Sequence, residues 1–194
     1  LSQTSPGIDR DLLDEIVTSC PGAEPDQIAD LYLSFLFAIL GSLSFSLTWA
    51  VHLLAQHPTT DATARSIVLE ALRLYPIAWL IARTPNSPFC LRDESVAITD
   101  TVVVSPYVIH RRADCWEAPN SFVPERWEDS ARRSSWLPFG CGAHACIAAS
   151  FTVEMLAALI QAIRLRGRPM LRRQLAKPVP SPALRPPKFE LTLA

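Results

Sequence analysis

The sequence has no marked excess of charge of either sign. Its 194 residues include 18 Lys and Arg against 19 Asp and Glu, which gives a formal net charge of -1 at pH 7. This balance provides no general electrostatic reason to bind nucleic acid or an anionic membrane surface, although basic residues gather in "RLRGRPMLRR" near the end. We interpret that segment as a solvated helix end, and we expect no nucleic-acid partner.

The chain also lacks the cysteine pattern of a disulfide-stapled protein. Its five cysteines are an odd number at irregular spacing, and no charged-then-apolar secretory leader is present. A disulfide framework is therefore not expected, and a reducing, cytoplasmic location is the default. Because the first residue is Leu, we interpret the chain as a fragment or a processed product.

Charge is missing altogether from residues 31–57, which contain no Asp, Glu, Lys or Arg. The surrounding sequence predicts one long helix that begins near Asp26 and ends before Pro58. Its length is sufficient for a membrane span, so membrane association through residues 31–55 stays open. Its many Ser and Thr residues, His52 and the absence of a flanking basic cluster favour the buried axis of a helical protein.

What the chain does have is enough apolar residues for one sizeable core: hydrophobic residues make up 49%, and the mean hydropathy is +0.18. The fold class we expect is mainly α with small β elements. No internal repeat appears, so we expect residues 1–194 to form a single domain. Beside the long helix, we expect helices over 11–19, 61–76 and from about 146, one or two strands within 96–110, an ordered loop over 111–138 and a terminal strand.

The stretch "FGCGAHACIA" concentrates residues that can carry chemistry. Gly140 and Gly142 allow a sharp turn and a close approach to a flat object, which a side chain would prevent. Cys146 stands at the predicted helix start, where free N–H groups stabilise a thiolate, and it is a plausible soft-metal ligand. A zinc site using Cys141, His144 and Cys146 lacks a fourth ligand of recognisable spacing. A glycine turn with buried thiols is the plain alternative.

Together with its preceding proline, this stretch resembles the heme-binding loop of the cytochrome P-450 monooxygenases, Phe-Gly-x-Gly-x-(Arg or His)-x-Cys-x-Gly. Three more stretches resemble the family in the same order: "LLAQHP" its long central helix, "EALRLYP" its Glu-x-x-Arg helix and "SPYVIHRRADCWEAPNSFVPERW" its meander. The resemblance runs from about residue 11 to the end. It implies the C-terminal part of that fold, an incomplete heme-binding domain without the family's N-terminal half.

The resemblance implies a role for each matching residue. Cys146 takes the position of the axial thiolate ligand of heme iron, and Phe139 packs beside it. The remaining heme contacts fall on Gly140 and Gly142 of the loop and on two propionate partners, His144 and Arg83. A buried ion triad that ties helix, meander and loop together is expected from Glu70, Arg73 and Arg126.

Three features depart from the family's pattern. The acid and alcohol near the oxygen-binding face fall on Gly41 and Ser42, so the acid is absent and Ser42 is the catalytic candidate for proton relay. Its plain alternative is a hydroxyl bonded back to its own helix. Ala148 replaces the glycine that follows the ligand, and the segment between Pro58 and Glu70 is shorter than the family's.

The function implied is insertion of one oxygen atom from O2 into a small, apolar organic substrate, bordered by "YPIAWLI". The cofactor is heme b, and NAD(P)H supplies electrons indirectly through a ferredoxin or flavin reductase. Without the family's front half, apolar surface is exposed, which predicts aggregation or dependence on a partner. The alternative is a non-catalytic truncated remnant that binds heme or a partner chain without turnover.

Overall fold

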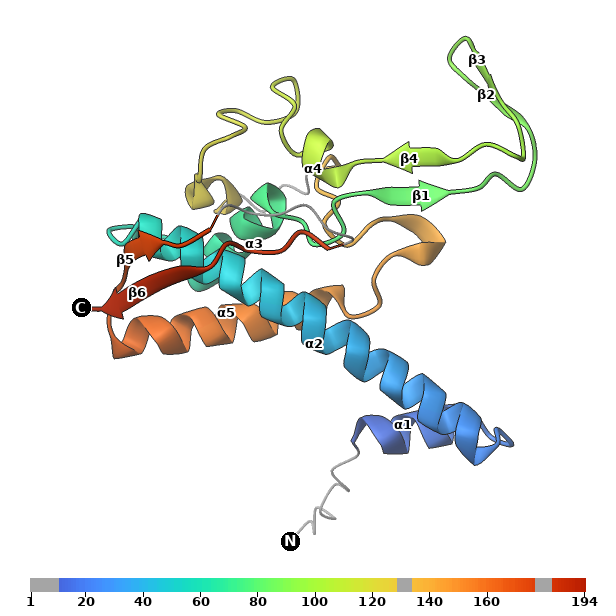
Figure 1. Ribbon diagram of the computed structural model, residues 1–194, viewed down its shortest axis with the longest axis horizontal. Coiled ribbons are helices and arrows are strands. Elements are labelled where there is room, and N and C mark those ends of the chain that lie inside the picture. The colour runs from blue at the N-terminus through green and yellow to red at the C-terminus, as the bar shows by residue number, and fades with distance from the viewer. Residues whose placement is uncertain (1–10, 129–133, 177–182) are drawn as a thin grey trace, which may run out of the picture. The chain divides into compact units, whose positions relative to one another are not determined.

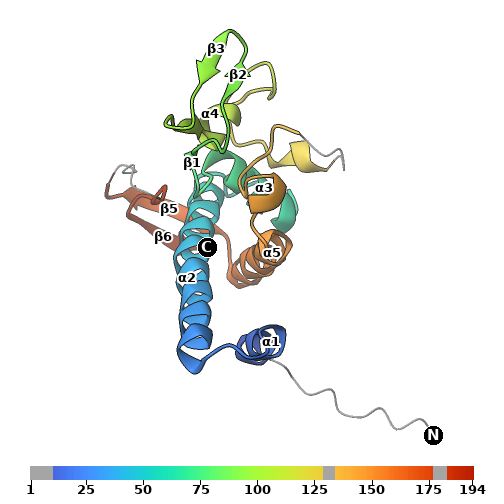
Figure 2. The same ribbon diagram turned by 90° about the vertical axis from the view of Figure 1, so that its right-hand side faces the viewer.

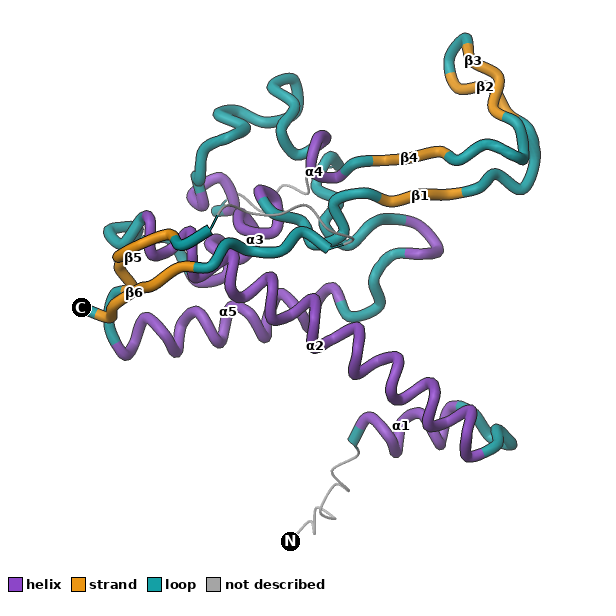
Figure 3. Tube along the Cα trace, viewed as in Figure 1, coloured by secondary structure: helices purple, strands orange, loops and turns teal. Residues whose placement is uncertain are grey.

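The computed structural model describes residues 11–128, 134–176 and 183–194 (Figure 1). Within them the chain is mainly helical, with three small two-stranded sheets (Figure 3). Contacts group the chain into two compact units, Leu1–Ser42 and Leu43–Ala194. The boundary falls within the helix α2 (Pro25–Gln56).

In the first unit, helix α1 (Leu12–Ser19) begins at a reciprocal cap. The Asp14 N–H donates to Oδ1 of Asp11 over 2.9 Å, and the Asp11 N–H donates to Oδ2 of Asp14 over 3.2 Å. These bonds satisfy N–H groups that have no partner inside the helix. The helix ends at Cys20, before Pro21 and Gly22, as expected from the sequence.

Helix α2 follows the predicted bounds but is buried over only part of its length. Trp49, Ala50 and Leu53, in the second unit, are almost fully buried, as predicted for the axis of a helical protein. The most apolar 18-residue window of α2 has none of its residues buried, and Phe37 is 86% exposed. Among the described residues, α2 is long and apolar enough to cross a membrane, a test that core helices of soluble proteins also pass.

The second unit is built around helix α3 (Ala64–Leu74), whose residues from Ser66 to Leu74 are all buried. Thr63 caps it, because its Oγ1 accepts a bond from the Ser66 N–H over 3.0 Å. The helix packs against α5 (Ala149–Arg166), as Figures 1 and 2 show. The apolar residues of this core come from α2, α3 and α5 and include Leu53, Leu54, Ile67, Val68, Leu72, Leu156 and Ile160.

The strands form antiparallel pairs along the second unit (Figure 3). The pairs are β1 (Ile81–Arg83) with β4 (Val102–Val104), β2 (Phe89–Leu91) with β3 (Glu94–Val96), and β5 (Pro169–Gln174) with β6 (Phe189–Leu193). The strand at the C-terminal end, β6, was predicted, and β4 lies within the segment 96–110 that was expected to hold one or two strands. The strands β1, β2 and β5 were not predicted, and β3 overlaps the expected segment only at Val96.

One predicted strand segment is instead helical. Residues Pro106–Ile109 form helix α4, although they follow the β-branched run "TVVV". Ser105 caps this turn, since its Oγ accepts the Val108 N–H over 3.3 Å. Pro106 occupies the first turn, where its missing N–H costs nothing. The Ser-Pro pair therefore outweighs the β propensity of the residues that follow.

The basic segment near the end is not simply the solvated end of a helix, as we had expected. Helix α5 ends before Gly167, which has a φ of 146° that favours glycine. The Arg168 N–H then donates to the Ala194 carbonyl over 2.8 Å, and residues 169–174 continue as strand β5. Backbone pairing with β6, the last strand of the chain, accounts for this segment.

The long segment over 111–138 is an ordered loop in its described part, with one short 3-10 helix, η1 (Pro124–Trp127). Aromatic rings run through it at contact distances. The ring centroids of Trp116 and Trp127 lie 5.8 Å apart, those of Trp127 and Trp136 5.4 Å, and those of Trp136 and Phe139 5.9 Å. This row of rings connects the loop to the stretch that carries Cys146.

Candidate functional site

Glu70 on α3 is the centre of a buried hydrogen-bond cluster. Its carboxylate accepts two bonds from Arg73, from Nε to Oε2 over 2.9 Å and from Nη2 to Oε1 over 2.8 Å. Both side chains are completely buried. Arg126 of η1 adds a bond from its Nε to Oε1 of Glu70 over 3.1 Å. The three side chains expected to form a triad therefore meet in the structure.

Two further donors to Glu70 could not be foreseen from the sequence. The backbone N–H of Val123 donates to Oε1 over 3.0 Å, and the indole Nε1–H of Trp127 donates to Oε2 over 2.9 Å. Trp127 directly follows Arg126 in "PERW", but a single sequence does not show which side chains of that turn point inward. With these bonds, donors from two segments, α3 and residues 123–127, surround one buried carboxylate.

The guanidinium of Arg73 also holds the loop after α4. Its Nη1 donates to the carbonyl oxygens of His110 and Pro119, each over 2.7 Å, and its Nη2 donates to that of Ser121 over 3.0 Å. With the bonds to Glu70, every N–H of this guanidinium has an acceptor. A buried charge of this kind is tolerated because its partners replace the water it has lost.

The loop that carries Cys146 is closed by backbone bonds. The Cys146 N–H donates to the Phe139 carbonyl over 2.9 Å, which brings the two ends of the motif together. Between them, residues Gly142–His144 form a turn of 3-10 helix, η2. Gly140 and Gly142 each have a φ of 70°, in the left-handed region. The two glycines of the motif therefore stand where the backbone requires them.

Cys146 is exposed and lies two residues before Ala148, the N-cap of α5. Its carbonyl accepts the Ala149 N–H over 3.3 Å, so the chain enters the helix directly after it. The helix begins slightly later than at Cys146 itself. Cys141 is exposed too, so the alternative of a glycine turn with buried thiols does not hold for either cysteine of the loop.

Strand β1 runs beside this loop. A Cβ built on Gly140 would lie 3.9 Å from Cδ1 of Ile81, the first residue of β1, and 3.8 Å from the carbonyl oxygen of His144. Arg83 is two residues further along the strand, on the same face as Ile81. Both Arg83 and His144 are exposed. Nη1 of Arg83 donates to the carbonyl of Ala82 over 2.8 Å.

The donor set around Cys146 does not make a metal site by itself. Within residues 11–128, 134–176 and 183–194, no three His, Cys, Asp or Glu side chains are placed to hold a metal ion. The zinc alternative with Cys141 and His144 is not supported among them. One exposed thiol instead suits a metal that arrives with its other ligands, as iron does in a porphyrin.

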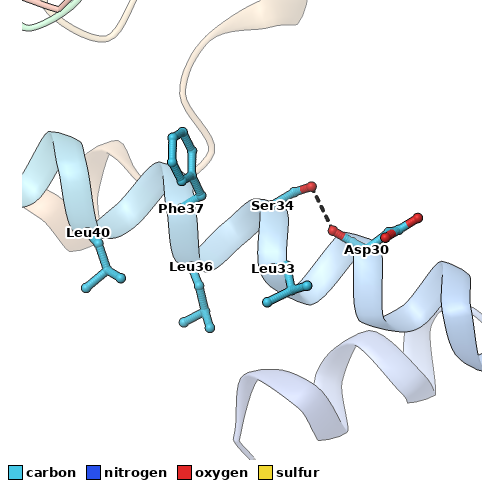
Figure 4. A pocket seen from close by; sticks show the side chains of 6 residues that line it. All are labelled: Asp30, Leu33, Ser34, Leu36, Phe37 and Leu40. Carbon is cyan, nitrogen blue, oxygen red and sulfur yellow. Dashed lines mark hydrogen bonds between the residues drawn. The ribbon is translucent and has the colours of Figure 1, made fainter.

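Ser42 belongs to the first unit, whereas the loop with Cys146 belongs to the second. The Ser42 hydroxyl donates to the Ala38 carbonyl one turn earlier, which is the bond back to its own helix weighed above. Nearer the N-terminal end of the same helix, Figure 4 shows Leu33, Leu36 and Leu40 projecting to one side. The Ser34 hydroxyl there donates to the Asp30 carbonyl, again one turn earlier. This apolar face contains no residue expected to act in chemistry.

A family model described as cytochrome P-450 matches residues 64–165, more than half of the chain, from α3 to the end of α5. The matched region contains the Glu70 cluster and the loop with Cys146. The chain belongs to the cytochrome P-450 family. Its relatives include cyclooctatin synthase of Streptomyces melanosporofaciens, 30% identical over 88% of this chain. Sterol 14alpha-demethylase of Mycobacterium tuberculosis is 25% identical over 80% of it.

Solved cytochromes P-450 show the same fold. A 6-coordinated member from Thermus thermophilus superposes with a TM-score of 0.75 at 24% identity, over 91% of this chain and 52% of its own. Another (CYP102L1) superposes with a TM-score of 0.83 at 24% identity, over 98% and 53%. The chain spans about 42% of the length of the two relatives named above, so it is a partial P-450 chain.

Proposed function

We propose that the chain carries the heme-binding part of a heme-thiolate monooxygenase, with heme b as the cofactor and Cys146 as the thiolate ligand of its iron. The observation that carries the proposal is the exposed Cys146, held by the Phe139 carbonyl at the end of a loop with two left-handed glycines. Bound heme would supply the iron at which dioxygen is activated. Family membership supports this chemistry.

The surrounding residues have distinct tasks in this proposal. Phe139 packs beside the ligand and holds its backbone N–H. Gly140 and Gly142 let the backbone pass close to the flat porphyrin, and a Cβ on Gly142 would meet nothing within 4 Å, so the turn itself requires the glycine there. His144 and Arg83, both exposed, bind the two propionates of heme as hydrogen-bond donors.

The Glu70 cluster fixes the loop of residues 111–138, which leads into the Cys146 loop. Arg73 and Arg126 share one carboxylate with the N–H groups of Val123 and Trp127, so the loop segments around η1 are fixed to α3. Preorganisation of this kind keeps a metal ligand in one place. Glu70, Arg73 and Arg126 are thus structural residues of the proposed site.

The proposed reaction inserts one oxygen atom from O2 into a small apolar organic molecule bordered by residues 75–81. Relatives named sterol 14alpha-demethylase and pentalenene oxygenase support an apolar substrate. Electrons come from NAD(P)H through a ferredoxin or flavin reductase. We place the protein in the cytoplasm, with membrane association through residues 31–55 as the alternative, and treat residues 1–194 as one incomplete domain.

A second candidate is a truncated remnant that binds heme or a partner chain without turnover. Three observations favour it. Gly41 stands where the family has an acid, and the Ser42 hydroxyl donates to the Ala38 carbonyl, so its proton is released to an acceptor elsewhere only when that bond breaks. The chain also spans 42% of its relatives' length.

The deciding experiment is a carbon monoxide difference spectrum of the reduced, heme-reconstituted 194-residue chain, compared between wild type, Cys146→Ala and Cys141→Ala. Both cysteines are exposed and belong to one loop, so Cys141→Ala is a matched control. We expect the thiolate-type Soret band to disappear only in Cys146→Ala. Its survival there overturns the ligand assignment. If wild type binds heme without turnover with peroxide, the remnant is supported.

A further inference from the structure

His110, at the end of α4, is completely buried and connects two parts of the second unit by its ring. Its Nδ1 lies 2.8 Å from the carbonyl oxygen of Arg73 on α3. Its Nε2 lies 2.8 Å from the backbone nitrogen of Leu137, at the start of the loop that leads to Cys146. One imidazole thus bridges the backbone of α3 and the backbone of the segment that leads into the proposed heme loop.

The two partners determine which ring nitrogen of His110 carries the proton. The Arg73 carbonyl can only accept a hydrogen bond, so Nδ1 must be the donor. The Leu137 N–H can only donate, so Nε2 must be the acceptor. Only the neutral Nδ1–H tautomer satisfies both, and a proton on Nε2 would face the proton of Leu137.

The charged groups near His110 are Arg73 and Glu70 on α3 and Arg111, the next residue in the chain. The neutral ring of Trp116 also meets the imidazole edge to face, with ring centroids 6.1 Å apart. Burial, together with the charges of Arg73 and Arg111, lowers the pKa of His110 to about 4, against the opposing effects of the Arg73 carbonyl and Glu70. The ring is therefore neutral at pH 7, as the two hydrogen bonds require.

The bridge continues into the loop through backbone bonds. The carbonyl of Leu137 accepts the Gly140 N–H over 3.2 Å, which begins the turn at the first glycine of the motif. Phe139, inside this turn, holds the Cys146 N–H. Because each of these bonds fixes the next residue, the position of Leu137 sets where the turn begins.

We propose that His110 is a positioning residue that fixes the start of the Cys146 loop to α3 through the Leu137 N–H. Sequence reasoning did not single it out, and the family resemblance gave it no part. As far as it concerns the thiolate, this inference rests on the proposed function. Its physical core, the bridge from Arg73 to Leu137, is independent of any bound group.

Two substitutions separate the two ends of the bridge. In His110→Gln, the longer amide side chain places its oxygen near the position of Nε2 and keeps an acceptor for Leu137. In His110→Asn, the shorter amide places a donor near the position of Nδ1 and keeps the bond to Arg73, but it cannot reach Leu137. Both replace the ring by an amide, so each is the control for the other.

The first measurement is hydrogen exchange in the chain without heme, read at the Leu137 amide and, for comparison, at amides of α3. We expect protection of Leu137 to be kept in His110→Gln and lost in His110→Asn, where exchange is about tenfold faster or more, with α3 unchanged in both. Equal protection of Leu137 in wild type and His110→Asn overturns the proposal.

If the Asn variant does not fold, wild type alone still gives a decisive result. Nitrogen NMR of the imidazole reports the tautomer, and a scalar coupling between His110 Nε2 and the Leu137 N–H reports the bond itself. A proton on Nε2 at pH 7 would contradict the assignment.

The second measurement tests the connection to Cys146 in the heme-reconstituted chain. We expect the thiolate-type share of the carbon monoxide difference band to be like wild type in His110→Gln and reduced severalfold in His110→Asn. If wild type takes up no heme, the proposed function fails while hydrogen exchange still decides the role of His110. If His110→Asn keeps the full thiolate-type band, the positioning role of His110 fails and the proposed function stands.

Discussion

The indole N–H of Trp127 donates to Oε2 of Glu70 over 2.9 Å, across 57 positions of sequence. Glu70 is also bonded to Arg73, three residues later on α3. A pair that reads as an ordinary surface ion pair of a helix is therefore buried, because a distant loop covers it and supplies donors. The loop and the helix stabilise each other, because the loop supplies hydrogen-bond donors to a carboxylate that it also buries.

Replacing Trp127 with Phe is expected to destabilise the chain by about 1.5–3 kcal/mol, the usual loss for a hydrogen bond to a buried charged group. Phe retains an aromatic ring against Trp116 and Trp136, so most of the packing is kept. The free energy of unfolding in urea measures the change. Glu125→Gln, exposed on the same 3-10 helix, is the control and should change stability by less than about 0.5 kcal/mol.

Glu70→Gln is expected to cost more, about 3–5 kcal/mol, because it removes the carboxylate that pairs with the completely buried guanidinium of Arg73. The matched control is Glu154→Gln on α5. Glu154 pairs with Arg65 at the surface, where the side chains are 65% and 57% exposed, and such pairs contribute up to about 1 kcal/mol. The free energy of unfolding in urea measures both losses. If Glu70→Gln and Glu154→Gln lose equal free energy, the buried cluster contributes no more to stability than the exposed pair.

Much of this arrangement could be predicted from local patterns. The bounds of α2 follow from Pro25 and Pro58, and the meeting of Glu70, Arg73 and Arg126 was expected from motifs that resemble the cytochrome P-450 family. The fold class expected from those motifs agrees with the solved cytochromes P-450. Patterns of this kind succeed where a motif is continuous in sequence.

What could not be predicted depends on contacts between distant segments. His110 lies in a stretch that reads as a strand, and its role is visible only when Leu137 is found beside it. The strand β5 forms because β6 pairs with it, although its own sequence is rich in Arg. The burial of α2 likewise depends on what covers it, since Trp49 and Phe37 share one apolar helix but differ entirely in exposure. Tertiary contacts overrode local preference in each case.

Stability should fall between pH 7 and pH 5 because of His110. Its pKa is about 4 in the folded chain and near its ordinary value of 6.5 when unfolded. As pH falls from about 6.5 to about 4, the unfolded chain takes up a proton that the folded chain refuses, so the stability from the neutral ring is progressively lost. Each unit of pKa difference corresponds to about 1.4 kcal/mol, so about 2 kcal/mol is lost by pH 5.

Urea unfolding of wild type and His110→Gln at pH 7 and pH 5 measures this contribution. Gln does not titrate, so the loss between the two pH values should be about 2 kcal/mol smaller in the variant. His52, whose pKa is also lowered by burial, contributes in the same direction but equally in both proteins. An identical pH dependence in wild type and variant would show that His110 does not remain neutral in the folded chain.

The glycines of the Cys146 loop should respond to alanine in the opposite sense from a glycine in a helix. Gly140 and Gly142 each have a φ of 70°, so Gly140→Ala and Gly142→Ala should each cost about 1–2 kcal/mol for the left-handed conformation alone. A Cβ at Gly142 would meet nothing within 4 Å, so crowding adds nothing there. Gly41 also has open space around it but lies within α2, where alanine should stabilise by up to about 1 kcal/mol. If Gly142→Ala and Gly41→Ala shift the urea midpoint in the same direction, backbone conformation is not what selects glycine in this loop.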